Sequence, residues 1–392
     1  MPSPAADSAA RRIYLDNAAT SWPKPEAVYL AVDDYQRRLG AAVGRGGYSE
    51  ASETERLITL CRGRVAALIG ASDVSRVIFT QNGTDSLNLA LHGLLRPGDH
   101  VVTSVCEHNS VLRPLRYLEQ HADLRVTYVG CDGQGYVDPD KIRAAVLPRT
   151  KLIALIHASN VTGALQPVEE VGRIAAECEV AYLVDAAQSL GHAPVDVKKI
   201  GCHLLAAPAH KGLLGPLGVG LLYIAPGLEQ RLAPARQGGT GTRSDEEEQP
   251  ATLPDKYEAG NLNAPGILGL GAALAERETI GLELETPQPL LADWLTALQE
   301  IPGLTLYGPR NATRRVGVFS FNLTGYEPQE LAALLDAAHH IQVRAGLHCA
   351  PRMHLALGTA PHGTVRISPG RYTTREDLAT TITALRDVGE AV

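Results

Sequence analysis

The residues best suited to chemistry are His210 and Lys211, which follow a run of small and apolar residues and precede a glycine-rich stretch, 215–220. A lysine at the end of a buried strand is costly to keep as an ammonium, so its pKa falls and its amine becomes nucleophilic. Such an amine can form an imine with an aldehyde. The same residues also fit a surface lysine in a β-turn, so the rest of the sequence must decide between the two.

A second site at the end of a predicted strand contains Asp185 and, three positions later, Gln188. In a parallel sheet the carboxyl ends of the strands open on one crevice, which would bring Asp185 close to Lys211. A buried carboxylate there could keep a pyridine nitrogen protonated, as pyridoxal 5'-phosphate (PLP) requires, and Gln188 could donate to the ring hydroxyl. The alternative is that Asp185 caps the next helix.

Residues 80–85, which include Gly83 and Thr84, end one predicted strand and open a helix that we expect to begin near Asp85. Free N–H groups at a helix start, together with the Thr84 hydroxyl, can bind a phosphate. The alternative is an ordinary turn with Thr84 as the helix N-cap.

Two further polar residues follow predicted strands. His108 is placed to stack on an aromatic cofactor ring, with His203 and His210 as rivals for that position. The amide of Asn160 could reach the cofactor oxygen or the carboxylate of a substrate, and as an ordinary loop asparagine it would have no such role.

The last candidate site lies near the C-terminus. Cys349 stands among Arg344, His348 and Arg352, whose positive charges would favour its thiolate form, so it is the best candidate nucleophile among the six cysteines. Arg366, within a short predicted strand, could grip an α-carboxylate through two hydrogen bonds, or form an ordinary surface ion pair.

The elements that would position these residues follow an α/β pattern. Short apolar runs alternate with amphipathic helical patterns between about residues 76 and 224, which predicts a large, mainly parallel seven-stranded sheet covered by helices. The predicted strands are residues 76–80, 100–105, 125–129, 151–156, 180–184, 203–207 and 218–224.

The remainder predicts an exposed loop and a smaller α+β domain. Residues 238–254 read as the loop and contain an acidic cluster, 245–248, while a long helix is expected over 265–284. Strands are expected at 303–307, 317–322 and 364–368. The final helix should begin at Thr374, with Asp377 completing a variant of the capping box. We therefore divide the chain into a disordered tail (1–12), a large domain (13–264) whose first segment could pack with the small domain, and a linking helix with the small domain (265–392).

Composition excludes several classes of protein. The 392 residues are 45% hydrophobic with a formal net charge of −7, which disfavours nucleic acid and anionic membranes as partners. No apolar run reaches the roughly 18 residues of a membrane span. The cysteines contain no CxxC pair, so we expect no metal site and a reducing, cytoplasmic location.

In this order the motifs resemble those of class V aminotransferase-fold enzymes, most closely the cysteine desulfurase and selenocysteine lyase family. The resemblance covers nearly the whole chain. It rests on residues 14–20, 82–85, 107–110, 159–163, 184–188, 210–211, 346–350 and 366. It implies the PLP-dependent transferase fold of type I and a homodimer in which Gly239, Thr240 and Gly241 of one subunit approach the phosphate bound by the other.

The resemblance also implies roles for individual residues. Lys211 would carry PLP as a Schiff base, Asp185 would pair with the pyridinium, Gln188 with the ring hydroxyl, and His108 would stack on the ring. His210 and Thr84 would bind phosphate, Asn160 and Arg366 the substrate carboxylate, and Cys349 would accept sulfur as a persulfide. One departure is Pro208, because the family usually has Ser or Thr two positions before the His-Lys pair.

The expected reaction is therefore conversion of L-cysteine to L-alanine, with transfer of sulfur to Cys349 and then to an acceptor such as a protein. Selenocysteine lyase, another C–S lyase and a class V aminotransferase remain open, because one fold supports many reactions. A non-catalytic protein with this fold is the remaining alternative, and the intact set of Lys211, Asp185 and His108 argues against it.

Overall fold

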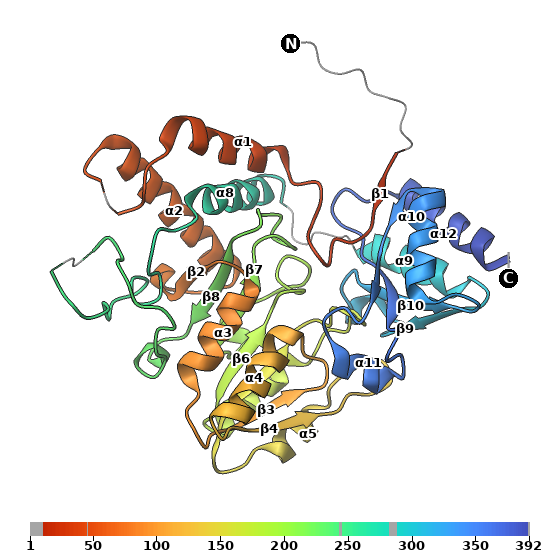
Figure 1. Cartoon of the computed structure of the whole chain (residues 1–392), viewed down its shortest axis with the longest axis horizontal. Helices are drawn as coiled ribbons and strands as arrows, with labels where there is room; N and C mark the ends of the chain where they lie inside the picture. Colours follow the sequence, from red (N-terminus) through yellow and green to blue (C-terminus); the bar gives the residue numbers. More distant parts are fainter. Residues whose placement is uncertain (1–10, 45, 243–244, 282–287, 391–392) are drawn as a thin grey trace.

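The computed structural model describes residues 11–44, 46–242, 245–281 and 288–390. A larger lobe and a smaller, C-terminal lobe lie side by side, the smaller one in blue at the right of Figure 1. The helices of the larger lobe are α1 (Glu26–Asp34), α2 (Ser49–Leu68), α3 (Gly83–Leu94), α4 (Asn109–His121), α5 (Pro139–Ala145), α6 (Val168–Glu177), α7 (Val197–Ile200) and α8 (Ala264–Thr279), with short turns at Tyr35–Leu39, Val74–Arg76 and Leu228–Gln230.

A seven-stranded sheet forms the centre of the larger lobe, in the order β2-β8-β7-β6-β5-β3-β4. Only β8 runs antiparallel to its neighbours. This confirms the predicted fold class. The strands are β2 (Val77–Thr80), β3 (His100–Ser104), β4 (Arg125–Val129), β5 (Thr150–Ile156), β6 (Ala181–Asp185), β7 (Leu204–Pro208) and β8 (Gly220–Ile224).

Both faces of this sheet are buried along its central strands, β5, β6 and β7. Along β5, Ile153 and Leu155 belong to the apolar cluster on one face, whereas Leu152 and Ala154 belong to the cluster on the other. Successive side chains of a strand point to opposite faces, so a strand covered on both sides must be apolar throughout. Polar groups that could act on a ligand follow these largely apolar stretches, and the carboxyl ends of β3, β5, β6 and β7 share one edge of the sheet.

The smaller lobe is built on a four-stranded antiparallel sheet of order β12-β13-β10-β9. Its core includes Trp294, Phe319 and Phe321, all fully buried. Its elements are α9 (Gln288–Gln299), β9 (Leu304–Tyr307), a short turn at Ala312–Arg314, β10 (Phe319–Leu323), α10 (Pro328–His339), β11 (Ile341–Gln342), β12 (Arg344–Gly346), α11 (Pro351–Leu357), β13 (Thr364–Ile367) and α12 (Arg375–Glu390).

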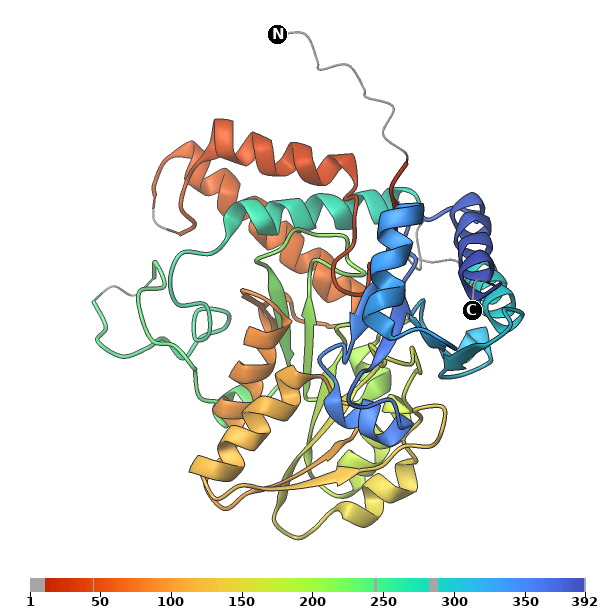
Figure 2. The same cartoon turned by 45° about the vertical axis from the view of Figure 1, so that its right-hand side comes forward.

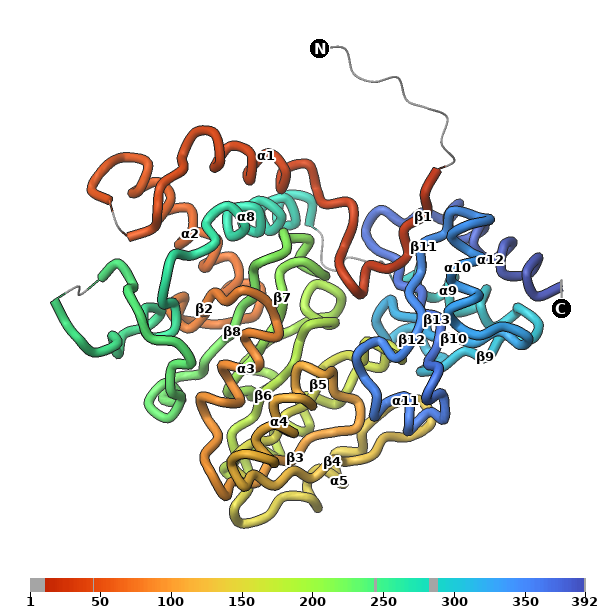
Figure 3. The backbone as a smooth tube through the Cα atoms, viewed as in Figure 1, coloured from red at the N-terminus to blue at the C-terminus, as the bar shows by residue number. Residues whose placement is uncertain are grey.

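The first strand of the chain belongs spatially to the smaller lobe. β1 (Ile13–Tyr14) pairs in parallel with β11, as the tube in Figure 3 shows, and Ile13 and Leu15 join the core of that lobe. The chain then crosses to the larger lobe, where α1 and α2 pack against α8 above the sheet (Figure 2). The segment from Leu15 to Ala18 therefore connects the two lobes.

Local predictions mostly agree with the structure, with some shifts. Thr374 and Asp377 cap α12 reciprocally, because the N–H of each donates to the side chain of the other. The helix expected over 265–284 ends at Thr279, and residues 282–287 lie outside the described residues. The acidic cluster 245–248 is exposed. Of the predicted tail 1–12, only Arg11 and Arg12 are described, and Arg11 pairs with Asp377.

In the part of the chain that the structure describes, no helix combines the length and the apolar composition of a membrane span.

Candidate active site

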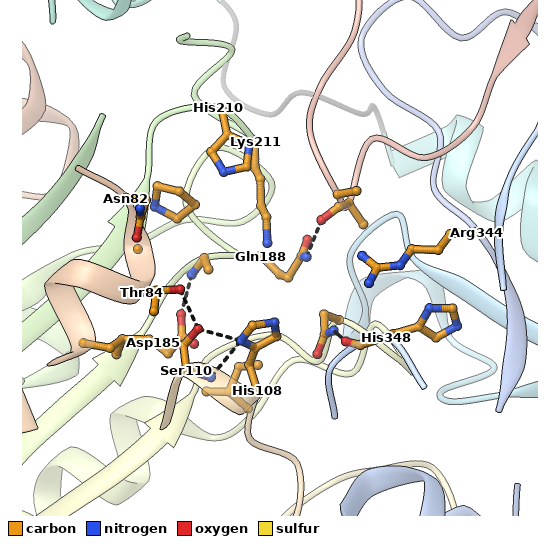
Figure 4. A pocket seen from close by; sticks show the side chains of 18 of the residues that line it. Asn82, Thr84, His108, Ser110, Asp185, Gln188, His210, Lys211, Arg344 and His348 are labelled. Carbon is orange, nitrogen blue, oxygen red and sulfur yellow. Dashed lines mark hydrogen bonds between the residues drawn. The ribbon is translucent and has the colours of Figure 1, made fainter. Parts of the chain in front are cut away.

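A cavity lies at the shared edge of the sheet, between the two lobes, and Figure 4 shows it from close by. Most of the polar side chains singled out in the sequence line it. The lining consists of Ala18, Ala19, Asn82, Gly83, Thr84, Leu87, His108, Ser110, Ile156, Asn160, Asp185, Ala187, Gln188, Pro208, His210, Lys211, Arg344, His348 and Arg366.

Lys211 and Asp185 define the floor of this cavity. Asp185 ends β6 and Lys211 follows β7, two neighbouring parallel strands, and the lysine amine points into the cavity in Figure 4. Burial lowers the pKa of Lys211 to about 8, although Asp185 opposes this shift. Burial raises the pKa of Asp185, while the N–H of Ala187 and the charge of Lys211 lower it. Lys211 is thus half-buried in the turn after β7, and its amine points into the cavity and not into solvent, unlike that of an ordinary surface lysine.

Gln188 lies beside Lys211, and a hydrogen bond to the N-terminal segment of the chain holds its side chain in place. Its amide nitrogen donates to the carbonyl oxygen of Ala18 at 2.8 Å. A primary amide has a second N–H and an acceptor oxygen, so this bond fixes the orientation and leaves further groups for a ligand.

The start of α3 forms one wall. Asn82, not Thr84, is the N-cap, because its side chain accepts the N–H of Asp85 at 2.9 Å. The helix begins at Gly83, two residues before the expected Asp85, and the Thr84 hydroxyl bonds to Ser110 at 2.7 Å. A Cβ at Gly83 would lie 3.2 Å from Cδ of Pro208, so the helix start sits tightly against the end of β7.

His108 is the N-cap of α4 and has one defined tautomer. Its Nδ1 accepts the backbone N–H of Ser110 at 3.0 Å, which places the ring proton on Nε2. Burial first, and then the charges of Lys211 and several arginines, lower the pKa of His108 to about 4. The ring is therefore neutral and fixed by its cap. Its rival His203 accepts the N–H of Tyr182 and does not line the cavity, whereas His210 does.

The opposite wall comes from the smaller lobe. Arg366 is fully buried on β13 and donates to the carboxylate of Asp16 at 2.7 Å and to the carbonyl of Asn160 at 3.1 Å. The side-chain oxygen of Asn160 is buried without a hydrogen-bond partner among the described residues, while its amide nitrogen donates to the carbonyl of His348. Arg366 is thus paired with a half-buried carboxylate of the segment that connects the lobes, and this is not an exposed surface ion pair.

Cys349 does not line the main cavity. It lies in an adjoining, more open one, and the two cavities share Thr84, His108 and Ser110. The backbone at His348 and Cys349 has φ of 47° and 60°, a strained, left-handed conformation for residues other than glycine. The carbonyl of Cys349 accepts the N–H of Asn109 at 2.7 Å, which holds the loop next to His108.

Only one of the three basic residues near Cys349 contacts its sulfur. Arg344 donates to Sγ at 3.6 Å. His348 donates from Nε2 to the carbonyl of Thr364, and its pKa is lowered well below the ordinary value, chiefly by burial, so it carries no charge. Arg352 lies over the ring of Tyr128 at 3.6 Å. The positive charge expected around the sulfur is therefore supplied mainly by Arg344.

Thr240 is the predicted site residue that lies apart from both cavities. It bonds to Thr242 in the loop after β8 and lines a separate hollow with Glu55 and Asp255.

Sequence reasoning missed Ser110 and Asp16 as contributors to the site. Ser110 connects Thr84 to His108, and Asp16 holds Arg366. Both lie inside motifs that carry the resemblance, 107–110 and 14–20. Their membership of those motifs was the available signal, since neither residue type alone indicates a function.

The cavity fits PLP by the chemistry of its lining. It offers the amine of Lys211, which points into the cavity, a buried carboxylate at Asp185 and the N-terminus of a twelve-residue helix, where a phosphate is favoured. Nδ1 of His210 is buried with no hydrogen-bond partner among the described residues, which leaves it to a ligand.

Comparisons with known proteins point to one family. A family model described as aminotransferase class V matches residues 13–380. The chain is 41% identical to a probable cysteine desulfurase of Methanothermobacter thermautotrophicus, over 93% of this chain and 92% of that protein. It is 33% identical to a cysteine desulfurase of Serratia proteamaculans, over 96% and 93%. The apo structure of the cysteine desulfurase from Thermococcus onnurineus NA1 superposes with a TM-score of 0.91 at 35% identity, over 97% of this chain and 95% of that one.

Proposed function

Because the chain belongs to the class V aminotransferase family, we propose that it is a cysteine desulfurase that converts L-cysteine to L-alanine and takes up the sulfur on Cys349 as a persulfide. The enzyme depends on PLP, the cofactor of its family. The observation that carries the proposal is the position of Cys349, with Arg344 at its sulfur, in a cavity that shares His108 with the cavity containing Lys211.

In this proposal the strand-end residues hold the cofactor. Lys211 would bind PLP covalently, Asp185 would pair with its ring nitrogen, Gln188 with its ring hydroxyl, and His108 would stack on the ring. Gly83 and Thr84 at the start of α3, together with His210, would hold the phosphate. Bound PLP supplies an electron-withdrawing ring that lowers the cost of removing the α-proton of the substrate.

The smaller lobe positions the substrate. Arg366 of the smaller lobe would hold the α-carboxylate together with Asn160, which follows β5 and accepts a hydrogen bond from Arg366, and Arg344 lines the same cavity. Once displaced, the neutral amine of Lys211 serves as the base for the α-proton, which its lowered pKa of about 8 favours near neutral pH.

Sulfur transfer then needs only Cys349. Its sulfur forms a bond to the sulfur of the substrate while the bond between Cβ and sulfur breaks, with the electron pair staying on the carbon side. Protons return to Cβ and Cα, which gives alanine. The persulfide passes to an acceptor, a protein or a small thiol, and the open cavity around Cys349 supports access from solvent.

We also propose a homodimer in the reducing cytoplasm. Thr240 lies away from the cavity of its own chain, which fits a role at the phosphate of the second subunit. All six cysteines are free thiols in the structure, which fits a reducing compartment.

The test measures sulfide and alanine together after L-cysteine is added to the purified protein with a thiol reductant. We expect equal amounts of both products, and loss of both in Cys349→Ala by about 100-fold or more, because the sulfur acceptor is absent. Cys178→Ala, at the end of α6, is the matched control and should behave as the native protein.

Three outcomes would replace the proposal. Sulfide release by Cys349→Ala at the native rate would remove the persulfide step. Formation of a keto acid in place of alanine would indicate an aminotransferase or a different C–S lyase, and activity on L-selenocysteine alone would indicate a selenocysteine lyase.

A further inference from the structure

Glu107, which none of the proposed steps uses, is a buried acid beside the cavity. It follows β3, directly before His108, and is 0% exposed. Its Oε1 accepts the hydroxyl of Ser104 at 2.6 Å and the N–H of Ile156 at 3.1 Å. Its Oε2 is buried with no hydrogen-bond partner among the described residues. A buried carboxylate with one oxygen unpaired and no cation beside it is strongly disfavoured.

A second carboxyl group lies close to Glu107. Ile156, which donates to Glu107, is the register partner of Asp185 on the neighbouring strand. Burial raises the pKa of Glu107 to about 8, the two hydrogen bonds to Oε1 oppose this shift, and the charge of Asp185 raises it further. Two buried carboxyl groups this close cannot both be ionised at little cost.

The other titratable groups around Glu107 do not supply a positive charge. Cys106 precedes it in the chain, and hydrogen bonding to Cys131 together with burial raises the pKa of Cys106 well above its ordinary value. The hydroxyl of Tyr182, on β6, is kept neutral by burial, which raises its pKa well above the ordinary value. Asp185 is therefore the one charged neighbour acting on Glu107 in this part of the described structure.

Glu258 is a second buried glutamate, and unlike Glu107 it forms an ion pair with an arginine. It is 8% exposed, and its two oxygens lie 2.6 and 2.8 Å from the two terminal nitrogens of Arg62. One oxygen also accepts the N–H of Phe79. Both oxygens of Glu258 are thus satisfied by a cation, whereas Glu107 has a hydroxyl and an amide on one oxygen only.

We propose that Glu107 is a positioning residue that works in its neutral, protonated form: it ties the ends of β3 and β5 together and leaves Asp185 as the single buried carboxylate at this edge. A charged Glu107 would increase the proton affinity of Asp185 and reduce the negative charge that Asp185 can offer to a ring nitrogen. The role in catalysis rests on the proposed function, whereas the protonation state does not.

The first experiment uses thermal unfolding of the apoprotein, native and Glu107→Gln, between pH 5 and pH 9. Glutamine has the shape of the protonated acid and does not ionise. A folded-state pKa raised above the unfolded one gives stability that is complete below the unfolded pKa and is lost as pH rises through the folded pKa. The native protein should therefore lose Tm relative to the variant from about pH 4.5 to about pH 8, after which the difference stays constant.

Glu258→Gln is the matched control. It removes one half of a buried ion pair, so its Tm should lie below that of the native protein at pH 7. A Tm difference between native and Glu107→Gln that stays constant from pH 5 to pH 8 would overturn the proposal, as would a Glu107→Gln protein destabilised at pH 7 to the same extent as Glu258→Gln.

If Glu107→Gln does not fold, infrared spectroscopy can test the protonation state of Glu107 directly. The Asp185→Asn protein should keep the carbonyl stretch of a protonated carboxylic acid at pH 7. This band should disappear at a lower pH than in the native protein, because the charge of Asp185 no longer raises the pKa of Glu107. Absence of any such band at pH 7 in both the native protein and Asp185→Asn would overturn the proposal. Neither measurement uses L-cysteine, so failure here is distinct from failure of the desulfurase assignment.

Discussion

The two walls of the cavity are built in different ways. On the sheet side, Asp185 ends β6, and Lys211 and His108 follow shortly after β7 and β3, strands whose direction and depth are fixed by the apolar core. On the side of the smaller lobe, Arg366 is held by Asp16, 350 residues away in the sequence, and Cys349 stands on a strained loop. Local sequence therefore fixes the first wall, whereas the second depends on contacts between distant segments.

The comparison predicts that changes on the sheet side act on the cofactor, with the largest effect at Lys211. Lys211→Ala should lose the covalent bond to PLP and the base for the α-proton, and turnover of L-cysteine should fall by about 1000-fold or more. Absorption spectroscopy of the reduced, borohydride-treated protein measures the covalent bond. Lys151→Ala, an exposed lysine on β5, is the control. Retention of covalent PLP by Lys211→Ala would break the assignment.

Changes on the side of the smaller lobe should act on the substrate. Asp16→Asn removes the charge that orients Arg366, and we expect KM for L-cysteine to rise roughly tenfold, as for loss of a charge-assisted hydrogen bond, with little change in PLP content. Steady-state kinetics measure this effect. Asp33→Asn, which removes an exposed pair with Arg37, should change nothing. A fall in PLP content with unchanged KM would show that the two walls do not divide their tasks in this way.

The pH dependence of PLP binding sharpens the picture of the sheet side. Only the neutral amine of Lys211 can attack the aldehyde, and its pKa is lowered to about 8. The rate of PLP uptake by apoprotein should rise about tenfold from pH 7 to pH 9 and then level off. Stopped-flow absorbance measures this rate. A rate that still rises steeply above pH 9 would indicate an ordinary lysine.

The smallest effect is expected at Pro208, where the family resemblance leads us to expect Ser or Thr. Pro208→Ser would add one donor near the start of α3, and one neutral hydrogen bond contributes about 1 kcal/mol, so PLP affinity should rise by no more than about fivefold. Fluorescence titration of the apoprotein with PLP gives the Kd. A tenfold loss of affinity would mean that the contact of Pro208 with Gly83 matters more than the missing hydroxyl.

Sequence reasoning placed the sheet side well and the other side less completely. Apolar runs followed by Asp185 or Lys211 are a local signal, and every strand of the central sheet lies within two residues of its predicted bounds. Nothing local to Asp16 shows that it meets Arg366, because that contact requires the two lobes to be assembled. The tautomer of His108 and the unpaired oxygen of Glu107 likewise depend on three-dimensional contacts.

The pairing of β1 with β11 bears on how the chain is made. Residues 13–14 find their partner only at residues 341–342. At a synthesis rate of about 5–20 residues per second, the first strand waits roughly 15–65 s on the ribosome before that partner is translated. In the folded protein Ile13 and Leu15 are buried in the core of the smaller lobe. During synthesis they cannot be buried there, because the rest of that core has not yet been translated. The nascent chain therefore exposes an unpaired apolar strand for most of its synthesis, and this is where a chaperone that binds such strands would act.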